Sequence, residues 1–314
     1  MNGTFNVTAV AAVTIWFGVT TFISLFGAAA FLVLILGIAS RRELHRGSGV
    51  LIIHLLAVEF CMVSIHYPIT NTVTFIARYY GDPNLLRSLD CALIQFFMTT
   101  FQHAGNWASF FLAINRFFAI LVPHRYRAIS SSSAILGMIL SSWAISLCCN
   151  LPLYFGVGGV IGNTISGDCG LLKTSKIDYP FRAAFAYYIP LISLIIIYFT
   201  LFMRTNYIRR YRVAVQIPTM SQLERARRRL SVTKMLFVSS VFYCLCYFPA
   251  PVIVTFFPSY SFNNRDAFLY IRMLVVCGYA SNPVGLNLGD RKGTMDGSTQ
   301  SRDGQGFPVI SQKS

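Results

Sequence analysis

The fold is decided by residues 91–126, which read CALIQFFMTTFQHAGNWASFFLAINRFFAILVPHRY. Most of this stretch is Phe, Leu, Ile, Ala and Met, and it exceeds the roughly 20 residues that an α-helix needs to cross a bilayer. Within it lie Gln102, His103 and Asn106, and Arg116 follows near the far end. An arginine at the bilayer centre costs about 2.5–3.5 kcal/mol on insertion scales. We therefore expect a membrane-spanning helix with Arg116 at its aqueous end.

The composition of the whole chain is that of a protein with several membrane spans. Of its 314 residues, 55% are hydrophobic and only 12% are charged, whereas an average soluble domain is about 25% charged. The net charge of +15 comes from basic residues between apolar segments, so nucleic acid is not expected as a partner. Seven helical spans are predicted, near residues 13–39, 50–76, 88–121, 134–155, 181–204, 231–257 and 267–288.

The distribution of basic residues predicts the orientation. Most arginines follow the first, third and fifth spans, whereas the alternating loops carry few basic residues and several acids, such as Asp82 and Asp168. Cytoplasmic loops are enriched in Lys and Arg, so we expect the N-terminus outside and the C-terminus inside. The basic loop residues are expected to contact anionic membrane lipid.

Three regions are expected along the chain. Residues 1–12 form an extracellular N-terminus, with glycosylation sequons at Asn2 and Asn6. Residues 13–288 form the seven-helix membrane domain. Residues 289–314 lack apolar periodicity, so they are predicted to be a disordered cytoplasmic tail. The abrupt change of pattern after Pro283 also fits an incorrect or alternative exon ending.

Markers in several spans resemble those of rhodopsin-like (class A) G-protein-coupled receptors. Arg116 follows Cys91 by 25 residues, which is the spacing of that family. Each marker alone is weak, because proline is common in membrane helices, but together and in order they are specific. The Asn-Arg-aromatic motif further resembles melatonin-like receptors and insect germ-cell and glial receptors. The other markers are Trp143, Pro190 with Tyr198 eight residues later, Cys246-Tyr247-Phe248-Pro249, and Asn282-Pro283-Val284-Gly285-Leu286.

The resemblance implies a plasma-membrane receptor that binds an extracellular ligand and signals to a heterotrimeric G protein. Such a receptor is not an enzyme, and neither a cofactor nor a metal is expected. In the family, the sixth span swings outward on the cytoplasmic side, and Pro249 marks where it can bend here. The expected orientation puts Cys91 and Cys169 on the oxidising side, where we expect a disulfide between them. The residues expected to carry coupling are Asn115, Arg116, Phe117, Tyr198, Pro249, Asn282 and Pro283.

Two departures from the family pattern concern acidic residues. Asn115 stands where the family has an acid that pairs with the arginine. We therefore expect packing and neutral hydrogen bonds to hold the inactive state, and basal signalling to be raised. Glu59 lies in mid-span, where desolvation favours a neutral acid. A protonated Glu59 that bonds to Asn282 is favoured over a sodium site, because Gly105 replaces a serine that the family often supplies.

The ligand pocket is expected in the outer half of the bundle. Met98 stands where amine receptors have an aspartate, and Val276 stands where opsins have the retinal-linking lysine, so neither ligand class is expected. Arg182 and Arg272 suit the carboxylate or phosphate of an anionic ligand, although each could instead reach lipid headgroups; peptide and lipid ligands also stay open. The candidate pocket residues are Met98, Thr99, Gln102, His103, Arg182, Tyr247 and Arg272.

Three other functions fit the sequence less well. A seven-span transporter usually shows internal repeats or paired acids, and neither pattern is visible here. A membrane enzyme needs clustered ligands or an activated nucleophile, whereas the five histidines are scattered. A signalling-impaired pseudo-receptor is compatible with Leu286 in place of the family tyrosine.

Overall fold

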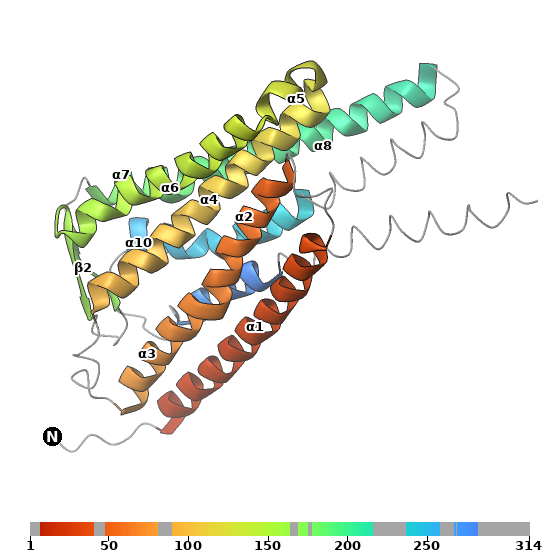
Figure 1. Ribbon diagram of the computed structural model, residues 1–314. Helices are drawn as coiled ribbons and strands as arrows, with labels where there is room; N and C mark the ends of the chain where they lie inside the picture. Colours follow the sequence, from red (N-terminus) through yellow and green to blue (C-terminus); the bar gives the residue numbers. More distant parts are fainter. Residues whose placement is uncertain are drawn as a thin grey trace, which may run out of the picture.

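The computed structural model describes residues 7–40, 48–80, 90–163, 169–174, 178–215, 237–257, 267 and 269–281. Its helices run side by side as a bundle (Figure 1). Helical stretches lie in all seven regions where spans are expected, so the predicted helical membrane class is confirmed. Outside the described residues lie the predictions for Asn2, Asn6, Asn282, Pro283 and the tail 289–314.

Five helical stretches are long and apolar enough to cross a membrane. The shorter apolar helix Leu269–Ser281 completes the described bundle together with the helix that contains Arg116. The first is α1 (Val7–Ala39), and the second is the continuous run of α2 (Ser48–Cys61), η2 (Met62–His66) and α3 (Tyr67–Tyr80). The third is α6 (Ser132–Tyr154), and the fourth is the continuous run of α7 (Asp178–Ala183), η4 (Ala184–Tyr188) and α8 (Ile189–Val215). The fifth is Phe237–Phe256, which ends in α10 (Pro249–Phe256).

Helix α4 (Cys91–Leu121) is the element against which most others pack. Its 31 residues are enough to cross a bilayer, although its polar residues keep it out of the five most apolar stretches. It contacts α2, α6, η4 and α8, so its polar side chains face protein rather than lipid. At its start, the Asp90 carboxylate accepts a hydrogen bond from the Leu93 N–H at 3.1 Å and caps the helix.

Two wide, π-helical turns stand directly before prolines. Segment η2 comes just before Pro68, and segment η4 comes just before Pro190. Proline has no N–H and its ring clashes with the preceding helical turn, so an extra residue in that turn relieves the clash. The prolines were visible in the sequence, but the wide turns were not, because they are a hydrogen-bond pattern rather than a residue pattern.

The main core cluster joins helices from every part of the chain. Close packing reaches α1, where a Cβ added to Gly27 would lie 2.8 Å from the Cβ of Ala280, so only glycine fits there. The cluster is unusually rich in buried tyrosine: Tyr67, Tyr198, Tyr243, Tyr247 and Tyr279.

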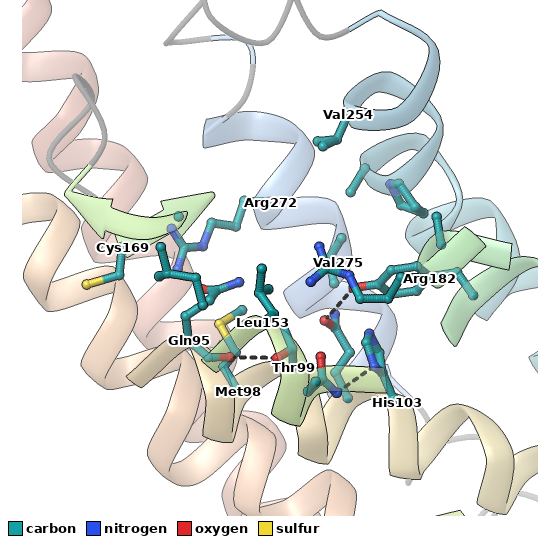
Figure 2. Close-up of a pocket in the computed structure, with 18 of the residues that line it drawn as sticks. Gln95, Met98, Thr99, His103, Leu153, Cys169, Arg182, Val254, Arg272 and Val275 are labelled. Carbon is teal, nitrogen blue, oxygen red and sulfur yellow. Dashed lines mark hydrogen bonds between the residues drawn. The ribbon is translucent and has the colours of Figure 1, made fainter. Parts of the chain in front are cut away.

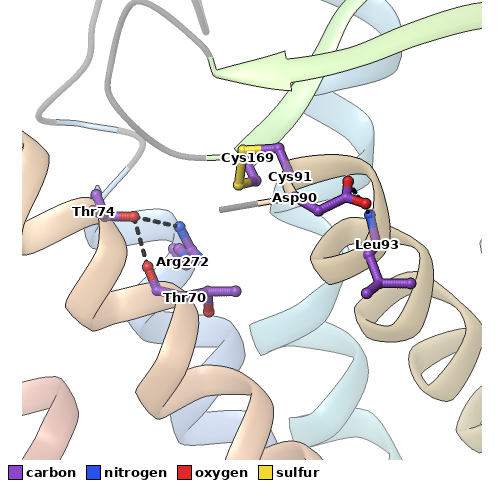
Figure 3. Close-up of a disulfide and its surroundings, with 7 residues drawn as sticks. All are labelled: Thr70, Thr74, Asp90, Cys91, Leu93, Cys169 and Arg272. Carbon is purple, nitrogen blue, oxygen red and sulfur yellow. Dashed lines mark hydrogen bonds between the residues drawn. A yellow bond between two sulfur atoms is a disulfide. The ribbon is translucent and has the colours of Figure 1, made fainter. Parts of the chain in front are cut away.

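A hairpin lies at the end of the bundle where α4 begins. Strands β1 (Gly159–Asn163) and β2 (Cys169–Thr174) pair antiparallel and contact α4. The expected disulfide between Cys91 and Cys169 is present, with the two Cα atoms 5.1 Å apart, and it ties β2 to the start of α4 (Figure 3). We call this the Cys91 end of the bundle.

The opposite end, where α4 finishes beyond Arg116, is the Arg116 end. A short helix that was not expected, α5 (Pro123–Ile129), follows α4 there, with a proline in its first turn. Proline suits that position, because the first N–H groups of a helix have no partner within the helix.

Candidate ligand cavity and the hydrogen-bonded junction beneath it

A cavity of about 250 Å³ lies near the Cys91 end. Its walls come from α3, α4, α6, the hairpin, α7, η4, α10 and Leu269–Ser281. Figure 2 shows Met98, Thr99 and His103 along α4, with Arg272 and Arg182 approaching from other helices. The structure brings together all seven candidate pocket residues: Met98, Thr99, Gln102, His103, Arg182, Tyr247 and Arg272.

Other polar side chains line the same cavity and were not singled out from the sequence. They are Tyr67, Gln95, Asn150 and Tyr187. The Tyr187 hydroxyl donates to Gln102 Oε1 at 3.4 Å. A signal for Asn150 did exist, since a polar residue within an apolar span usually faces the bundle interior.

Two arginines contribute positive charge to the cavity wall. Arg272 is half-buried, and one of its terminal nitrogens donates to Thr74 Oγ1 of α3 at 3.2 Å (Figure 3). Thr74 in turn donates to the carbonyl of Thr70 at 2.8 Å. Arg182 of α7 lines both this cavity and a neighbouring groove of about 460 Å³ beside α6. A guanidinium in such a wall can pair with a carboxylate or phosphate through two parallel hydrogen bonds.

His103 and Asn150 form a buried polar pair between α4 and α6. Asn150 Nδ2 lies 2.8 Å from His103 Nδ1 and donates to the Ser146 carbonyl at 2.8 Å. Each side chain is 2% exposed. His103 Nε2 and Asn150 Oδ1 have no hydrogen-bond partner in the described protein. A buried polar atom left in that state costs about 1–3 kcal/mol.

Stacked tyrosines form the floor of the cavity. Tyr247 lines the cavity and lies in contact with Tyr187, at a ring-centroid distance of 5.8 Å. Below it, Tyr243 stacks on Tyr247 at 5.4 Å, and Tyr279 meets both rings edge-on. The rings therefore continue the cavity wall into the middle of the bundle.

Asn106 of α4 connects this floor to η4. Its Nδ2 donates to the Ala186 carbonyl of η4 at 3.0 Å and lies 3.5 Å from the Tyr247 hydroxyl. The Tyr243 hydroxyl donates to Asn106 Oδ1 at 3.0 Å and lies 3.3 Å from the Tyr279 hydroxyl. We call Asn106, Tyr243, Tyr247, Tyr279 and the Ala186 carbonyl the Asn106 junction.

Pro190 explains why a backbone carbonyl is available to this junction. Because proline lacks an N–H, the carbonyls four and five residues before it receive no helical hydrogen bond from it. Those are the carbonyls of Ala186 and Phe185, and α4 supplies a donor to each. Asn106 donates to the first, and Trp107 Nε1 donates to the second at 3.1 Å.

The Arg116 end differs from the middle of the bundle. Asn115 is fully buried, yet neither atom of its amide has a hydrogen-bond partner among the described residues. The neutral hydrogen bonds expected at this end are therefore not made by Asn115. Arg116 interacts electrostatically with the buried Tyr198 hydroxyl. Phe117 packs against the core cluster.

Two further predicted positions lie in other spans. Pro249 begins α10, and Phe248 before it keeps helical dihedral angles and donates to the Cys244 carbonyl at 2.8 Å. The helix therefore continues through Pro249, and the bend there stays a prediction. Glu59 is 3% exposed on α2. Its predicted partner Asn282 lies outside the described residues, so that hydrogen bond stays a prediction.

Comparison with known proteins gives a consistent result. Residues 30–284 match the family described as 7 transmembrane receptor (rhodopsin family). Short-wave-sensitive opsin 1 of Saimiri boliviensis boliviensis is 26% identical over 61% of this chain and 53% of its own length. Galanin receptor 2b of Danio rerio is 24% identical over 76% of this chain and 62% of its own length. The allatostatin-A receptor of Bombyx mori is 24% identical over 77% and 65%, respectively. The chain thus spans less than two thirds of each relative.

Proposed function

The chain belongs to the rhodopsin family of seven-transmembrane receptors, and from this premise we propose that it converts ligand binding in the cavity into activation of a heterotrimeric G protein. As a member of that family it is a multi-pass membrane protein, and the typical location of such a receptor is the plasma membrane. The family is one of receptors rather than enzymes.

The Asn106 junction is the observation that carries this proposal. Tyr247 belongs both to the cavity wall and to the junction, so a ligand that displaces its ring disturbs the contact with Asn106. Tyr243 and Tyr247 lie one turn apart on the same helix, just before Pro249. Rotation of that helix would therefore break or remake the bond between Tyr243 and Asn106. Ligand binding shifts such an equilibrium only through differential contacts in the two states, and the junction offers such contacts.

The Arg116 end is the proposed site of the G protein. The basic residues of the sequence support a cytoplasmic location for this end, with the N-terminus outside. Outward motion of Phe237–Phe256 would uncover Arg116, and Tyr198 beside it would stabilise the open arrangement. We assign coupling to the predicted set Asn115, Arg116, Phe117, Tyr198, Pro249, Asn282 and Pro283.

The proposed ligand is neither an amine nor retinal. Met98 places a thioether rather than a carboxylate in the cavity wall, and Leu269–Ser281 contains no lysine that could form a Schiff base. Arg272 and Arg182 support a ligand with an anionic group. The names of the galanin and allatostatin-A receptors favour a peptide-like molecule for this chain as well.

A biosensor that reports separation of Gα from Gβγ tests this function without a known ligand. Because Arg116 has no acidic neighbour at position 115, we expect a basal signal that rises with the amount of receptor at the cell surface. Arg116→Ala, matched for surface expression, should abolish that rise, whereas Arg78→Ala in α3 should not. No rise for the unchanged chain with any class of Gα would overturn the proposal. A substrate-driven flux in the same cells would favour the transporter alternative.

A further inference from the structure

The groove of about 460 Å³ beside α6 lies on the outside of the bundle. Its lining comes from α6, from the turn that follows α6, and from α7 and η4. Cys148 of α6 is exposed there, and Val157 and Phe181 are each 65% exposed. In a receptor that crosses the membrane, exposed apolar side chains of this kind face lipid tails. The groove therefore opens to the bilayer.

Two side chains line both this groove and the ligand cavity, namely Leu153 and Arg182. Leu153 is 7% exposed and Arg182 is half-buried. Figure 2 shows both among the side chains of the cavity. They form a common wall, with lipid-facing space on one side and the proposed ligand site on the other. The Arg182 guanidinium can thus pair with an anion in either space.

Arg182 determines the charge of the groove. It is the only charged side chain among the described residues that line the groove. A positive charge beside lipid tails is costly unless it reaches the headgroups or pairs with an anion. A guanidinium has several N–H donors, so it can bind a carboxylate through two parallel hydrogen bonds and keep other contacts. A negatively charged occupant is therefore favoured.

The apolar lining around Arg182 selects the kind of anion. Leu153, Phe181 and Phe185 line the same groove as Arg182, so the charge and the hydrocarbon of an occupant must be adjacent. In a fatty acid the carboxylate is attached directly to the acyl chain, whereas in a phospholipid a glycerol backbone separates the phosphate from the tails. We propose that this groove binds an unesterified long-chain fatty acid from the bilayer, with its carboxylate on Arg182 and its chain along α6.

This site goes beyond the proposed function, because its occupant is a membrane lipid rather than the ligand of the cavity. The shared guanidinium couples the two spaces. While a fatty acid holds Arg182, Arg272 is the remaining cation among the described residues of the cavity wall. Occupation of the groove therefore lowers the positive charge that an anionic ligand meets in the cavity.

A photoreactive palmitic acid that carries a mid-chain diazirine tests the site on the full chain in phosphatidylcholine nanodiscs. After illumination, peptide mass spectrometry should find the label within residues 144–158 and 181–185. Unlabelled palmitic acid should suppress this labelling at a concentration at least about tenfold lower than hexadecan-1-ol or methyl palmitate, because neither of these offers a carboxylate. Equal suppression by the alcohol would overturn the role of Arg182. Equal suppression by palmitoyl-oleoyl phosphatidylserine would overturn the choice of a fatty acid over a two-chain lipid.

Two pairs of variants locate the effect. Arg182→Gln should reduce the labelling at least about tenfold, whereas Arg272→Gln removes a cation that lines only the cavity and should leave the labelling unchanged. Ala144→Phe fills the groove from an exposed α6 position and should prevent labelling. Ser141→Phe is its control, because it adds the same ring at an exposed α6 position outside the groove lining. Labelling that persists in Arg182→Gln or Ala144→Phe, or that is lost in Arg272→Gln, would contradict the assignment.

The biosensor result stays separate from this outcome, because photolabelling needs no G protein. If the labelling fails while the basal signal depends on Arg116, the fatty-acid site is wrong and the receptor function stands. If the groove is labelled as expected while no Gα responds, the site stands and the coupling proposal falls.

Discussion

The middle of the bundle and the Arg116 end contain the same buried side chain in opposite situations. Asn106 is 1% exposed, and both ends of its amide are used by neighbouring helices. Asn115 lies on the same helix and is fully buried, but its amide has no partner in the described protein. A satisfied amide fixes the arrangement of the helices around it, whereas an unsatisfied one raises the energy of the state in which it is enclosed. The hydrogen bonds of Asn106 thus fix the helices in the middle of the bundle, whereas the buried amide of Asn115 favours a rearrangement of the helices at the Arg116 end.

The cavity lies between these extremes. Asn150 uses its NH₂ group twice within the protein and leaves its oxygen unfilled. That oxygen is enclosed by protein, so it can gain a partner only if the side chains around it rearrange. The number of amide atoms without a hydrogen-bond partner therefore rises from none in Asn106 to one in Asn150 and two in Asn115.

Asn106→Leu is expected to have the largest effect. It should lower the free energy of unfolding by about 2–6 kcal/mol, because the Ala186 carbonyl and the Tyr243 hydroxyl each lose a partner at about 1–3 kcal/mol. Unfolding in mixed micelles with increasing dodecyl sulfate measures this change. The same substitution at Asn115 is the control, and it should stabilise the protein by about 1 kcal/mol because no bond is lost. If both variants were destabilised equally, the contrast between the two asparagines would have no energetic basis.

Asn115→Asp is expected to stabilise the closed arrangement of the Arg116 end. A carboxylate next to the Arg116 guanidinium should favour the closed arrangement by about 1 kcal/mol, which lowers basal signalling roughly fivefold. The biosensor reads this at equal surface expression. Asn106→Asp is a useful companion, because it adds the same charge at a distance from Arg116. An unchanged signal in Asn115→Asp would show that Arg116 does not need to be uncovered for signalling.

Trp107→Phe is expected to have the smallest effect. The loss of the hydrogen bond to the Phe185 carbonyl should cost about 1 kcal/mol. In a Pro190→Ala background the new N–H can serve that carbonyl from within its own helix, so the cost should fall by about 0.5 kcal/mol. A double-mutant cycle of unfolding free energies measures the difference. Strictly additive changes would mean that Trp107 and Pro190 act independently.

Much of the fold could be predicted from the sequence, because its signals are local. Apolar length predicts the helices, the cysteines predict the disulfide, and prolines mark the positions of both wide turns. The hairpin that contains Cys169 and the short helix α5 were missed, since loop conformation depends on what the loop packs against. The wide turns themselves were missed because only a hydrogen-bond pattern defines them.

The candidate site was predicted unevenly for a related reason. Position along a helix indicated which residues face the cavity, so Met98, Thr99 and Tyr247 were identified. Asn150 was missed although a polar residue in an apolar span is itself a signal, because its role arises from contact with His103 on another helix. Asn106 was noticed as polar, but its role depends on the carbonyl that Pro190 leaves without a donor 84 positions away in the chain.

The hydrogen bonds from α4 to the carbonyls of η4 affect how the sequence of this receptor can change in evolution. Both Asn106 and Trp107 donate to main-chain oxygens, which every amino acid possesses. Natural variation at positions 185 and 186 can therefore reshape this helix surface, including the groove that Phe185 lines, while both hydrogen bonds persist. Related sequences could therefore change the side chains on this surface without losing the hydrogen bonds that join α4 to η4.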